Sequence, residues 1–268
     1  MKNKNIKKIK VTEVLLLSVA AALLLLEIFP PEYTSDEKMN GMISVTVTRT
    51  IGSLVFLLLL FRFGYKITGG IKRKFGTAMA AFLPALAVAV NNFPIIGILG
   101  GAACVTYSAR YVLVYAVESL MIGLFEELAF RGVLYMSLLE EHRADSRQIF
   151  MVTVASSAVF GCIHFFNLFA GGSPGSVLLQ IGYSFLIGGM CSIVLLKTGC
   201  IWLCVLLHAV YDFGGYLIPT LGKGRIWDPV TVTLTAVLGA AVALCMTYQL
   251  IHTDPSEINA LFPKKCKK

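Results

Sequence analysis

Two adjacent glutamates, Glu126 and Glu127, lie inside the apolar stretch from Tyr111 to Leu139, and Arg131 follows four residues after the second. An ionisable group at the centre of a membrane helix costs about 2.5–3.5 kcal/mol on insertion scales. Because Glu127 and Arg131 share one face of a helix, we expect them to form an ion pair that lowers this cost. Glu126 lies about 100° further around the helix and has no partner in this segment. A carboxylate in apolar surroundings suits a general base or acid near neutral pH, so Glu126 is the candidate for chemistry.

Two histidines also fall in apolar stretches. His164 follows Phe160 by four residues, and His208 precedes Asp212 by four, so each pair shares a helix face. Counted at about 1.5 Å per residue from the expected membrane boundary, Glu126, His164 and His208 lie about 20, 18 and 15 Å deep. A single buried histidine or Glu–Arg pair is more often structural than catalytic. Together, at matching depth on separate helices, these residues indicate an active site or a transport site.

The composition predicts the elements that position these residues. The chain has 268 residues, of which 57% are hydrophobic and 14% charged, and its mean hydropathy is +0.78. A soluble domain has about 25% charged residues, so we predict an all-α fold, a polytopic membrane helix bundle of about eight transmembrane helices. The expected spans are Val11–Phe29, Ile43–Phe61, Thr77–Leu99, Tyr111–Leu139, Ile149–Phe169, Val177–Leu196, Cys200–Leu217 and Val230–Ile251. The third is interrupted by Asn91, Asn92 and Pro94 and is expected to be broken or re-entrant.

The charge pattern predicts orientation and domain limits. Residues 1–10 form a basic tail, residues 11–251 a single integral membrane domain, and residues 252–268 a second basic tail. The loop from Arg62 to Lys74 is also basic, so both termini are expected to be cytoplasmic. The net charge of +8 is concentrated in the tails and one class of loop, which argues against a nucleic-acid partner. The seven cysteines form no CxxC pair and are expected to be mostly buried apolar side chains.

Three motifs occur in order on successive or near-successive spans: Glu126-Glu127-x-x-x-Arg131, Phe160-x-x-x-His164 and His208-x-x-x-Asp212. Over about residues 111–216, the expected catalytic core, this pattern resembles the CAAX protease and bacteriocin-processing (CPBP, or Abi) family. These are intramembrane glutamic endopeptidases related to the enzyme that trims prenylated CAAX proteins. The remaining segments are similar to the family only in being membrane spans.

The resemblance implies a mechanism. Glu126 and His164 would hold and activate a water molecule that attacks the scissile carbonyl. His208 and Asp212 would serve the oxyanion side, and Glu127 and Arg131 would support the site. Many relatives have Asn at the position of Asp212. Because an ionised carboxylate accepts hydrogen bonds and cannot stabilise an oxyanion directly, we hypothesise that Asp212 orients His208.

Three functions compete at this stage. The first is an intramembrane endopeptidase whose partners are the bilayer and a membrane-associated protein or peptide substrate. The second is a metalloenzyme, since two Glu and two His can bind zinc. No HExxH motif is present, and we favour a site without a cofactor. The third is a non-proteolytic protein, such as a bacteriocin-immunity factor or a transporter. The lysine-rich tails and compact size favour a bacterial plasma membrane, while the substrate and oligomeric state are not readable from the sequence.

Overall fold

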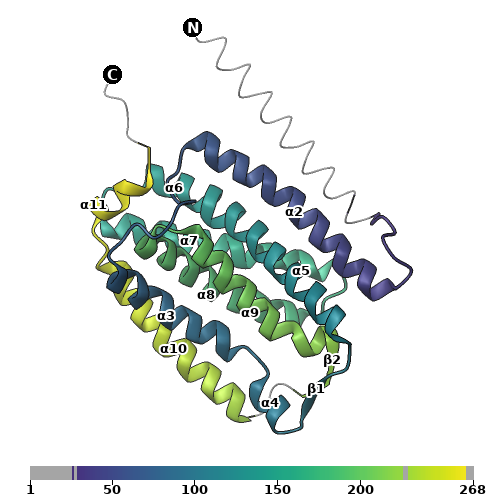
Figure 1. Cartoon of the computed structure of the whole chain (residues 1–268). Helices are drawn as coiled ribbons and strands as arrows, with labels where there is room; N and C mark the ends of the chain where they lie inside the picture. The colour runs from purple at the N-terminus through teal and green to yellow at the C-terminus, as the bar shows by residue number, and fades with distance from the viewer. Residues whose placement is uncertain (1–25, 27–28, 226–228, 264–268) are drawn as a thin grey trace.

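The computed structural model describes residue 26, residues 29–225 and residues 229–263, and these are mostly helical (Figure 1). The predicted first span Val11–Phe29 and the N-terminal tail therefore lie almost entirely outside the described residues, as does the end of the C-terminal tail. The helices are α2 (Glu37–Phe63), α3 (Phe75–Asn91), α4 (Ile95–Leu99), α5 (Ala109–Glu127), the π-helix η1 (Leu128–Tyr135), α6 (Met136–Glu141), α7 (Ser146–Ile163), the 3₁₀-helix η2 (His164–Leu168), α8 (Pro174–Thr198), α9 (Ile201–Leu221), α10 (Pro229–Ile251), α11 (Pro255–Ile258) and the 3₁₀-helix η3 (Asn259–Leu261).

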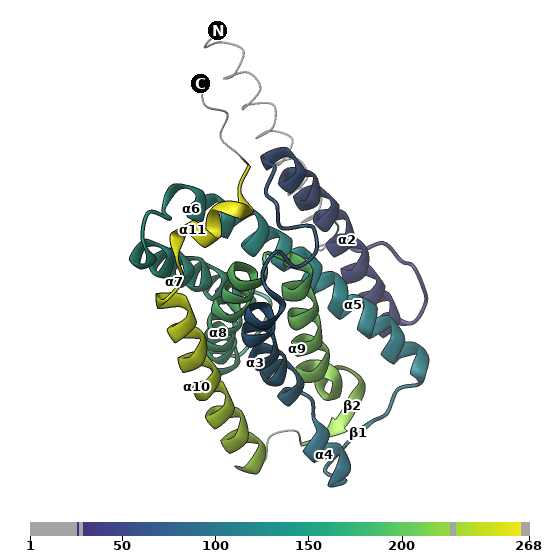
Figure 2. The same ribbon diagram turned by 60° about the vertical axis from the view of Figure 1, so that its left-hand side comes forward.

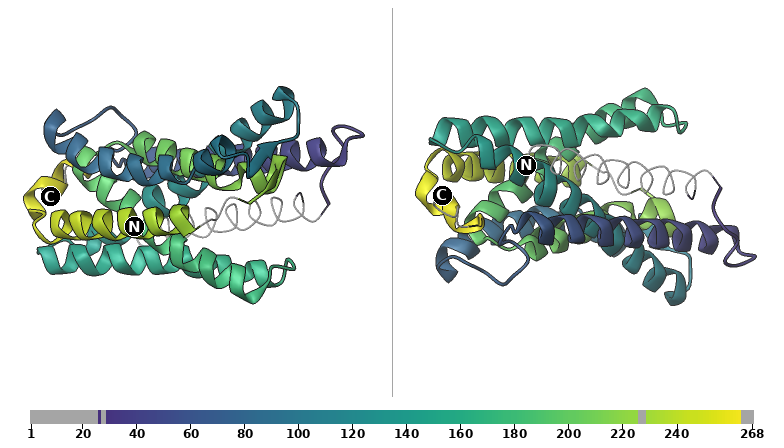
Figure 3. Two further views of the ribbon diagram at one scale, coloured as in Figure 1. Left: turned by 90° about the horizontal axis from the view of Figure 1, so that it is seen from below. Right: turned by 90° about the horizontal axis from the view of Figure 1, so that it is seen from above.

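The long helices share one rough direction, as the two views in Figure 3 show. Helices α8 and α9 lie in the middle of the bundle, with α2 and α5 on one side and α3 and α10 on the other (Figure 1). The turned view in Figure 2 shows α10 on the side away from α2 and α5. The main apolar core draws on nearly all of these helices and is built around buried side chains such as Leu128, Val194 and Leu207. This arrangement places α5, α7, α8 and α9 around a common interior.

Five helices in the described part of the chain are long and apolar enough to cross a membrane. They are Glu37–Phe63, Ser146–Leu168, Pro174–Thr198, Ile201–Leu221 and Pro229–Ile251. Together with the exposed apolar side chains on their outer faces, they define an integral membrane protein. The predicted count of about eight spans is not established: the first predicted span lies outside the described residues, the third is a shorter helix, and the fourth carries several charged residues.

The predicted span Tyr111–Leu139 is one continuous helical run with a change of winding in its middle. Helix α5 ends at Glu127, the π-helix η1 follows directly, and α6 continues from Met136. A π-helix is rare, occurs mostly as a bulge inside an α-helix, and is frequently found at functional sites. The change of winding begins immediately after the glutamate pair.

The predicted break in the third span is present. Helix α3 ends at Asn91 and the short α4 begins at Ile95. The two asparagines at the break join separate helices: Asn91 Nδ2 donates to Thr235 Oγ1 of α10 at 2.9 Å, and Asn92 Nδ2 donates to the Tyr211 carbonyl of α9 at 2.8 Å. These two polar residues interrupt the apolar pattern of the sequence, and in the structure they hydrogen-bond across helices.

A two-stranded antiparallel ladder, which the all-α prediction did not include, lies at one end of the bundle (Figure 1). Strand β1 (Ala103–Val105) pairs with β2 (Gly222–Gly224), with Cys104 opposite Lys223. A Cβ on Gly222 would lie close to the Cys104 carbonyl, so this position needs glycine. The ladder joins the segment before α5 to the segment after α9.

Two glycines allow the helices that carry the motifs to approach closely. A Cβ on Gly123 of α5 would lie 3.0 Å from the Ala209 nitrogen and 3.1 Å from the Val205 carbonyl, both in α9. A Cβ on Gly161 of α7 would lie 2.8 Å from the Ile181 carbonyl of α8. Small residues at such positions let membrane helices pack backbone to backbone. The α5–α9 contact lies one turn from Glu126 and beside His208.

Asp36 fixes the start of α2 outside the apolar part of that helix. Its Oδ1 accepts a hydrogen bond from the Met39 N–H at 2.6 Å, and its Oδ2 accepts one from the Tyr111 hydroxyl of α5 at 2.8 Å. The backbone hydrogen bond, followed by the one from Tyr111, holds the pKa of this carboxyl below its usual value. This cap therefore ties the beginning of α2 to α5.

Candidate active site

Glu127 is the centre of the buried polar cluster. Its Oε1 lies 3.1 Å from Arg131 NH1 and 2.7 Å from His208 Nδ1. The exposed fractions are 0% for Glu127, 1% for Arg131 and 5% for His208. The predicted Glu127–Arg131 pair is thus present, although NH1 is not in hydrogen-bonding geometry. The contact with His208 was not expected from the sequence, because it joins residues 81 positions apart.

The other ring nitrogen of His208 faces two more carboxylates. Its Nε2 lies 3.4 Å from Asp212 Oδ2 and 3.5 Å from Glu126 Oε2. The predicted placement of His208 and Asp212 on one face of α9 is therefore correct. With carboxylates beside both nitrogens, the ring can donate on both sides only when it is doubly protonated. Glu127 contacts the ring at Nδ1, on its buried side, so that the opposite nitrogen Nε2 faces the cavity.

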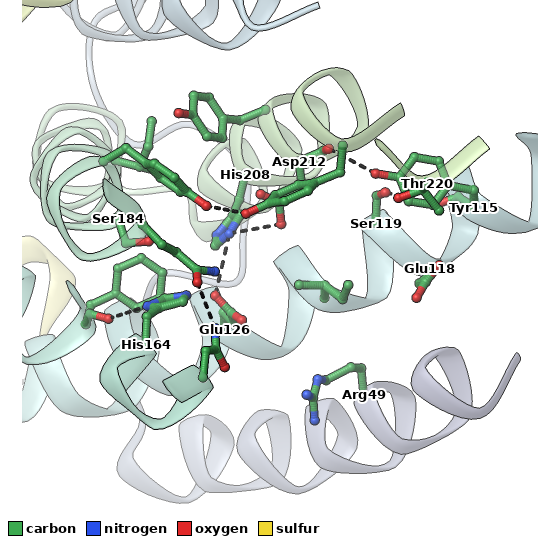
Figure 4. A pocket seen from close by; sticks show the side chains of 18 residues that line it. Arg49, Tyr115, Glu118, Ser119, Glu126, His164, Ser184, His208, Asp212 and Thr220 are labelled. Atoms are coloured by element: carbon green, nitrogen blue, oxygen red, sulfur yellow. Dashed lines mark hydrogen bonds and ion pairs between the residues drawn. The ribbon is translucent and has the colours of Figure 1, made fainter. Parts of the chain in front are cut away.

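His164 lies on the wall opposite α9, at the first residue of η2. Its Nδ1 lies 3.0 Å from the Phe160 carbonyl. With the proton on Nδ1, that nitrogen donates to the carbonyl and Nε2 keeps its lone pair. Figure 4 shows His164 and Glu126 lining the same part of the cavity.

Phe160 packs against the charged groups of the cluster. The Arg131 guanidinium lies over its ring at 4.1 Å, and the His164 and His208 rings meet it edge to face at 5.4 and 5.8 Å. A cation over an aromatic face gains about 0.5–2 kcal/mol. The Phe160-x-x-x-His164 motif therefore has a packing role: its aromatic ring separates Arg131 from the two imidazoles.

Glu126, His164, His208 and Asp212 all line one cavity of about 360 Å³ (Figure 4). Helices α2, α5, α8 and α9 and the α7–η2 junction supply its walls. The structure therefore brings together the four residues predicted to be catalytic, whereas Glu127 and Arg131 lie buried behind them. A cavity of this volume is in the range of small-ligand sites in proteins.

The sequence analysis missed several residues of this cavity. Glu118, eight residues before Glu126 on α5, and Arg49 of α2 line it, and both are ionisable groups in apolar helices. An ionisable side chain in an apolar segment is the same feature that singled out Glu126, so it could also have identified Glu118 and Arg49. Tyr183 and Tyr216, whose hydroxyls hydrogen-bond to each other, also line the cavity. Their types and spacing alone would not have distinguished them from other aromatic residues of the bundle.

Among residues 29–225 and 229–263, no group of three or more His, Cys, Asp or Glu side chains is placed to hold a metal ion. The carboxylates of Glu126 and Asp212 instead lie 3.4–3.5 Å from a nitrogen of His208, as ion-pair partners.

The fold and the site define an integral membrane protein with a carboxylate–imidazole cluster buried between its helices. Residues 108–214 match the family model described as Type II CAAX prenyl endopeptidase Rce1-like. This segment contains all three motifs, so the central part of the chain is similar to this family, in agreement with the resemblance drawn from the motifs. No curated protein and no solved structure matches the chain. The family that this model describes is one of proteases.

Proposed function

We propose that this protein hydrolyses a peptide bond of a membrane-associated protein or peptide, with a water molecule activated by Glu126 and His164. The single observation that carries the proposal is one cavity lined by Glu126, His164, His208 and Asp212. A reaction that needs a base, a positioned nucleophile and an oxyanion donor needs such groups within one cavity.

The first step is attack on the carbonyl. Glu126 takes one proton from water, while His164 Nε2 accepts a hydrogen bond from the other hydrogen. The water oxygen bonds to the carbonyl carbon, and the electron pair of the C=O bond moves to its oxygen. The protonated carboxyl of Glu126 then gives its proton to the leaving nitrogen as the C–N bond breaks, which yields a carboxylic acid and an amine.

The oxyanion side is assigned to His208. Its Nε2–H, aimed into the cavity, donates to the developing oxyanion. Glu127 supports this role because its Oε1 is 2.7 Å from Nδ1 and holds the ring in place. Asp212, 3.4 Å from Nε2, orients the same nitrogen and balances the charge of a doubly protonated ring. Arg131 in turn balances Glu127.

A second cavity supports a substrate with an apolar part. It has a volume of about 360 Å³ and a mostly apolar lining, drawn chiefly from α3, α7, α8 and α10. Tyr183, Ile187 and Tyr211 line both cavities and form a shared wall. Burial of apolar groups contributes about 25 cal/mol per Å². An apolar group held there would lie beside the reacting groups.

The decisive experiment is comparative peptidomics of cells that carry the wild type, Glu126→Gln or Glu141→Gln. Glu141, exposed at the end of α6, provides a matched control. We expect peptides that are produced by the wild type and the control and are absent with Glu126→Gln. Thermal unfolding of the purified variants should show that Glu126→Gln remains folded.

Two results would contradict the proposal. Peptide production by Glu126→Gln at the wild-type level would mean that Glu126 is not the base, and would favour a binding or transport role. Complete loss of cleavage after treatment with a strong chelator would show that a metal is required.

A further inference from the structure

The catalytic cavity extends along α5 beyond the reacting groups, to Glu118. Glu118 and Glu126 lie on the same helix, eight residues apart, which is about 12 Å along the axis. Both line the cavity, and Glu118 lies among Tyr115, Ser119 and Thr220 at the end away from His164 (Figure 4). The proposed chemistry uses Glu126 and gives Glu118 no role.

Glu118 is half-buried, and one oxygen of its carboxylate lacks a hydrogen-bond partner among the described residues. Its Oε2 is shielded from solvent and has no hydrogen-bond partner in the part of the chain that the structure describes. Leaving a buried acceptor unpaired costs about 1–3 kcal/mol, and more when it is charged. A buried group that is costly to the free protein yet lines a cavity is suited to binding a ligand.

Two cationic side chains in the neighbourhood of Glu118, those of Lys38 and Arg49, lie over aromatic rings. Lys38 acts on Glu118 electrostatically, but its ammonium lies over the Tyr107 ring, 5.6 Å from the centroid. The Arg49 guanidinium lies over the Phe125 ring at 5.0 Å. Ser119, adjacent in the chain, donates its hydroxyl to the Tyr115 carbonyl. None of these contacts supplies a donor to Oε2.

We propose that Glu118 determines substrate specificity by binding a cationic nitrogen of the substrate. The inference rests on the proposed protease function, because it places the substrate in the same cavity. An extended peptide advances about 3.3 Å per residue, so 12 Å corresponds to about three to four residues from the scissile bond. The cationic group is the side chain of Lys or Arg, or the α-amino group of a chain that begins there.

A carboxylate with one oxygen shielded from solvent and unpaired discriminates in favour of such a group. Charge-assisted hydrogen bonds are shorter and roughly twice as strong as neutral ones. A neutral or acidic residue at the same position would leave Glu118 unpaired or facing a like charge. We therefore expect at least about a tenfold preference in kcat/KM, the factor that corresponds to one such hydrogen bond.

The test uses the full chain purified in detergent micelles and a synthetic peptide library whose cleavage sites are read by mass spectrometry. The wild type, Glu118→Gln, Glu118→Lys and Glu141→Gln are compared. We expect basic residues to be enriched three to four residues from the cut with the wild type and the Glu141→Gln control. The enrichment should disappear with Glu118→Gln and change to acidic residues with Glu118→Lys. Acetylating the peptide N-termini separates an α-amino group from a basic side chain.

The same cleavage profile with the wild type and Glu118→Gln would overturn the proposal. Thermal unfolding provides a second measurement: Glu118→Gln should be at least as stable as the wild type, because it removes the charge from a half-buried carboxylate with an unpaired oxygen. Unfolding of this variant would make Glu118 structural and would also overturn the proposal. A Glu126→Gln sample tests the protease function separately, since wild-type cleavage that persists in this variant refutes the catalytic assignment and leaves the Glu118 preference measurable.

Discussion

The buried triad of Arg131, Glu127 and His208 leads to a prediction in which one variant regains stability without regaining activity. In Arg131→Met, the Glu127 carboxylate loses its cation 3.1 Å away while it remains fully buried. Removing one partner of a buried pair costs about 3–5 kcal/mol. Each kcal/mol corresponds to roughly 2–4 °C in a protein of this size. We therefore expect the Tm of Arg131→Met to fall by roughly 6–20 °C.

The double variant Glu127→Leu/Arg131→Met should recover most of this loss. Replacing a whole buried ion pair by apolar residues of similar volume is often neutral or stabilising, by about 1–4 kcal/mol. Part of the gain is lost because His208 Nδ1 no longer has its acceptor 2.7 Å away. This variant should therefore be more stable than Arg131→Met and yet have little activity, since the His208 ring is no longer held.

A third variant, Glu127→Gln/Arg131→Met, keeps a carbonyl oxygen as acceptor for His208 Nδ1. It should have a higher kcat than the Leu/Met variant at comparable stability. The assays are thermal unfolding in detergent micelles and turnover of a peptide identified by the peptidomics experiment. If the Leu/Met variant were as unstable as the sum of both single variants, the pair would not be coupled and this reasoning would be wrong. Equal turnover of the Leu/Met and Gln/Met variants would refute the orienting role of Glu127.

Three further predictions follow from the geometry. A Cβ on Gly188 would lie 3.0 Å from Arg131 NH2, whereas one on Gly189 meets Ser157 Oγ at an ordinary 3.6 Å. Gly188→Ala should therefore lower the free energy of unfolding by about 1–3 kcal/mol, and Gly189→Ala should leave it unchanged. Thermal unfolding measures both. Asp212→Asn replaces the carboxylate 3.4 Å from His208 Nε2 by an amide; kcat should fall and its pH profile should shift, and full activity with an unchanged profile would show that the carboxylate is not needed. A Cβ on Gly239 meets no atom within 4 Å, so Gly239→Leu should fill the apolar cavity without unfolding the protein. Gly239→Leu should reduce cleavage of lipid-modified peptides more than cleavage of unmodified ones, and Gly41→Leu is the control. The same ratio of the two cleavage rates in Gly239→Leu and in the wild type would contradict this prediction.

The sequence alone predicted the five described helices that are long and apolar enough to cross a membrane, and it singled out the candidate residues. Long apolar segments have few alternatives to a helix in a bilayer, because each backbone polar group must find a partner within its own segment. Ionisable residues in such segments are costly, so Glu126, His164, His208 and Asp212 could be recognised by type and spacing. The same cost predicted the local pair of Glu127 and Arg131, since four residues span about one helical turn.

Only the tertiary structure showed that His208 lies between carboxylates from two helices. The Glu127–His208 contact joins α5 to α9, and it depends on how closely these helices approach at Gly123, which no helical periodicity reports. The π-helix after Glu127 was also not predictable, because its winding is set by packing rather than by local preference. The place of Glu118 in the cavity follows from the same packing, since the direction in which a side chain points depends on the neighbours its helix meets.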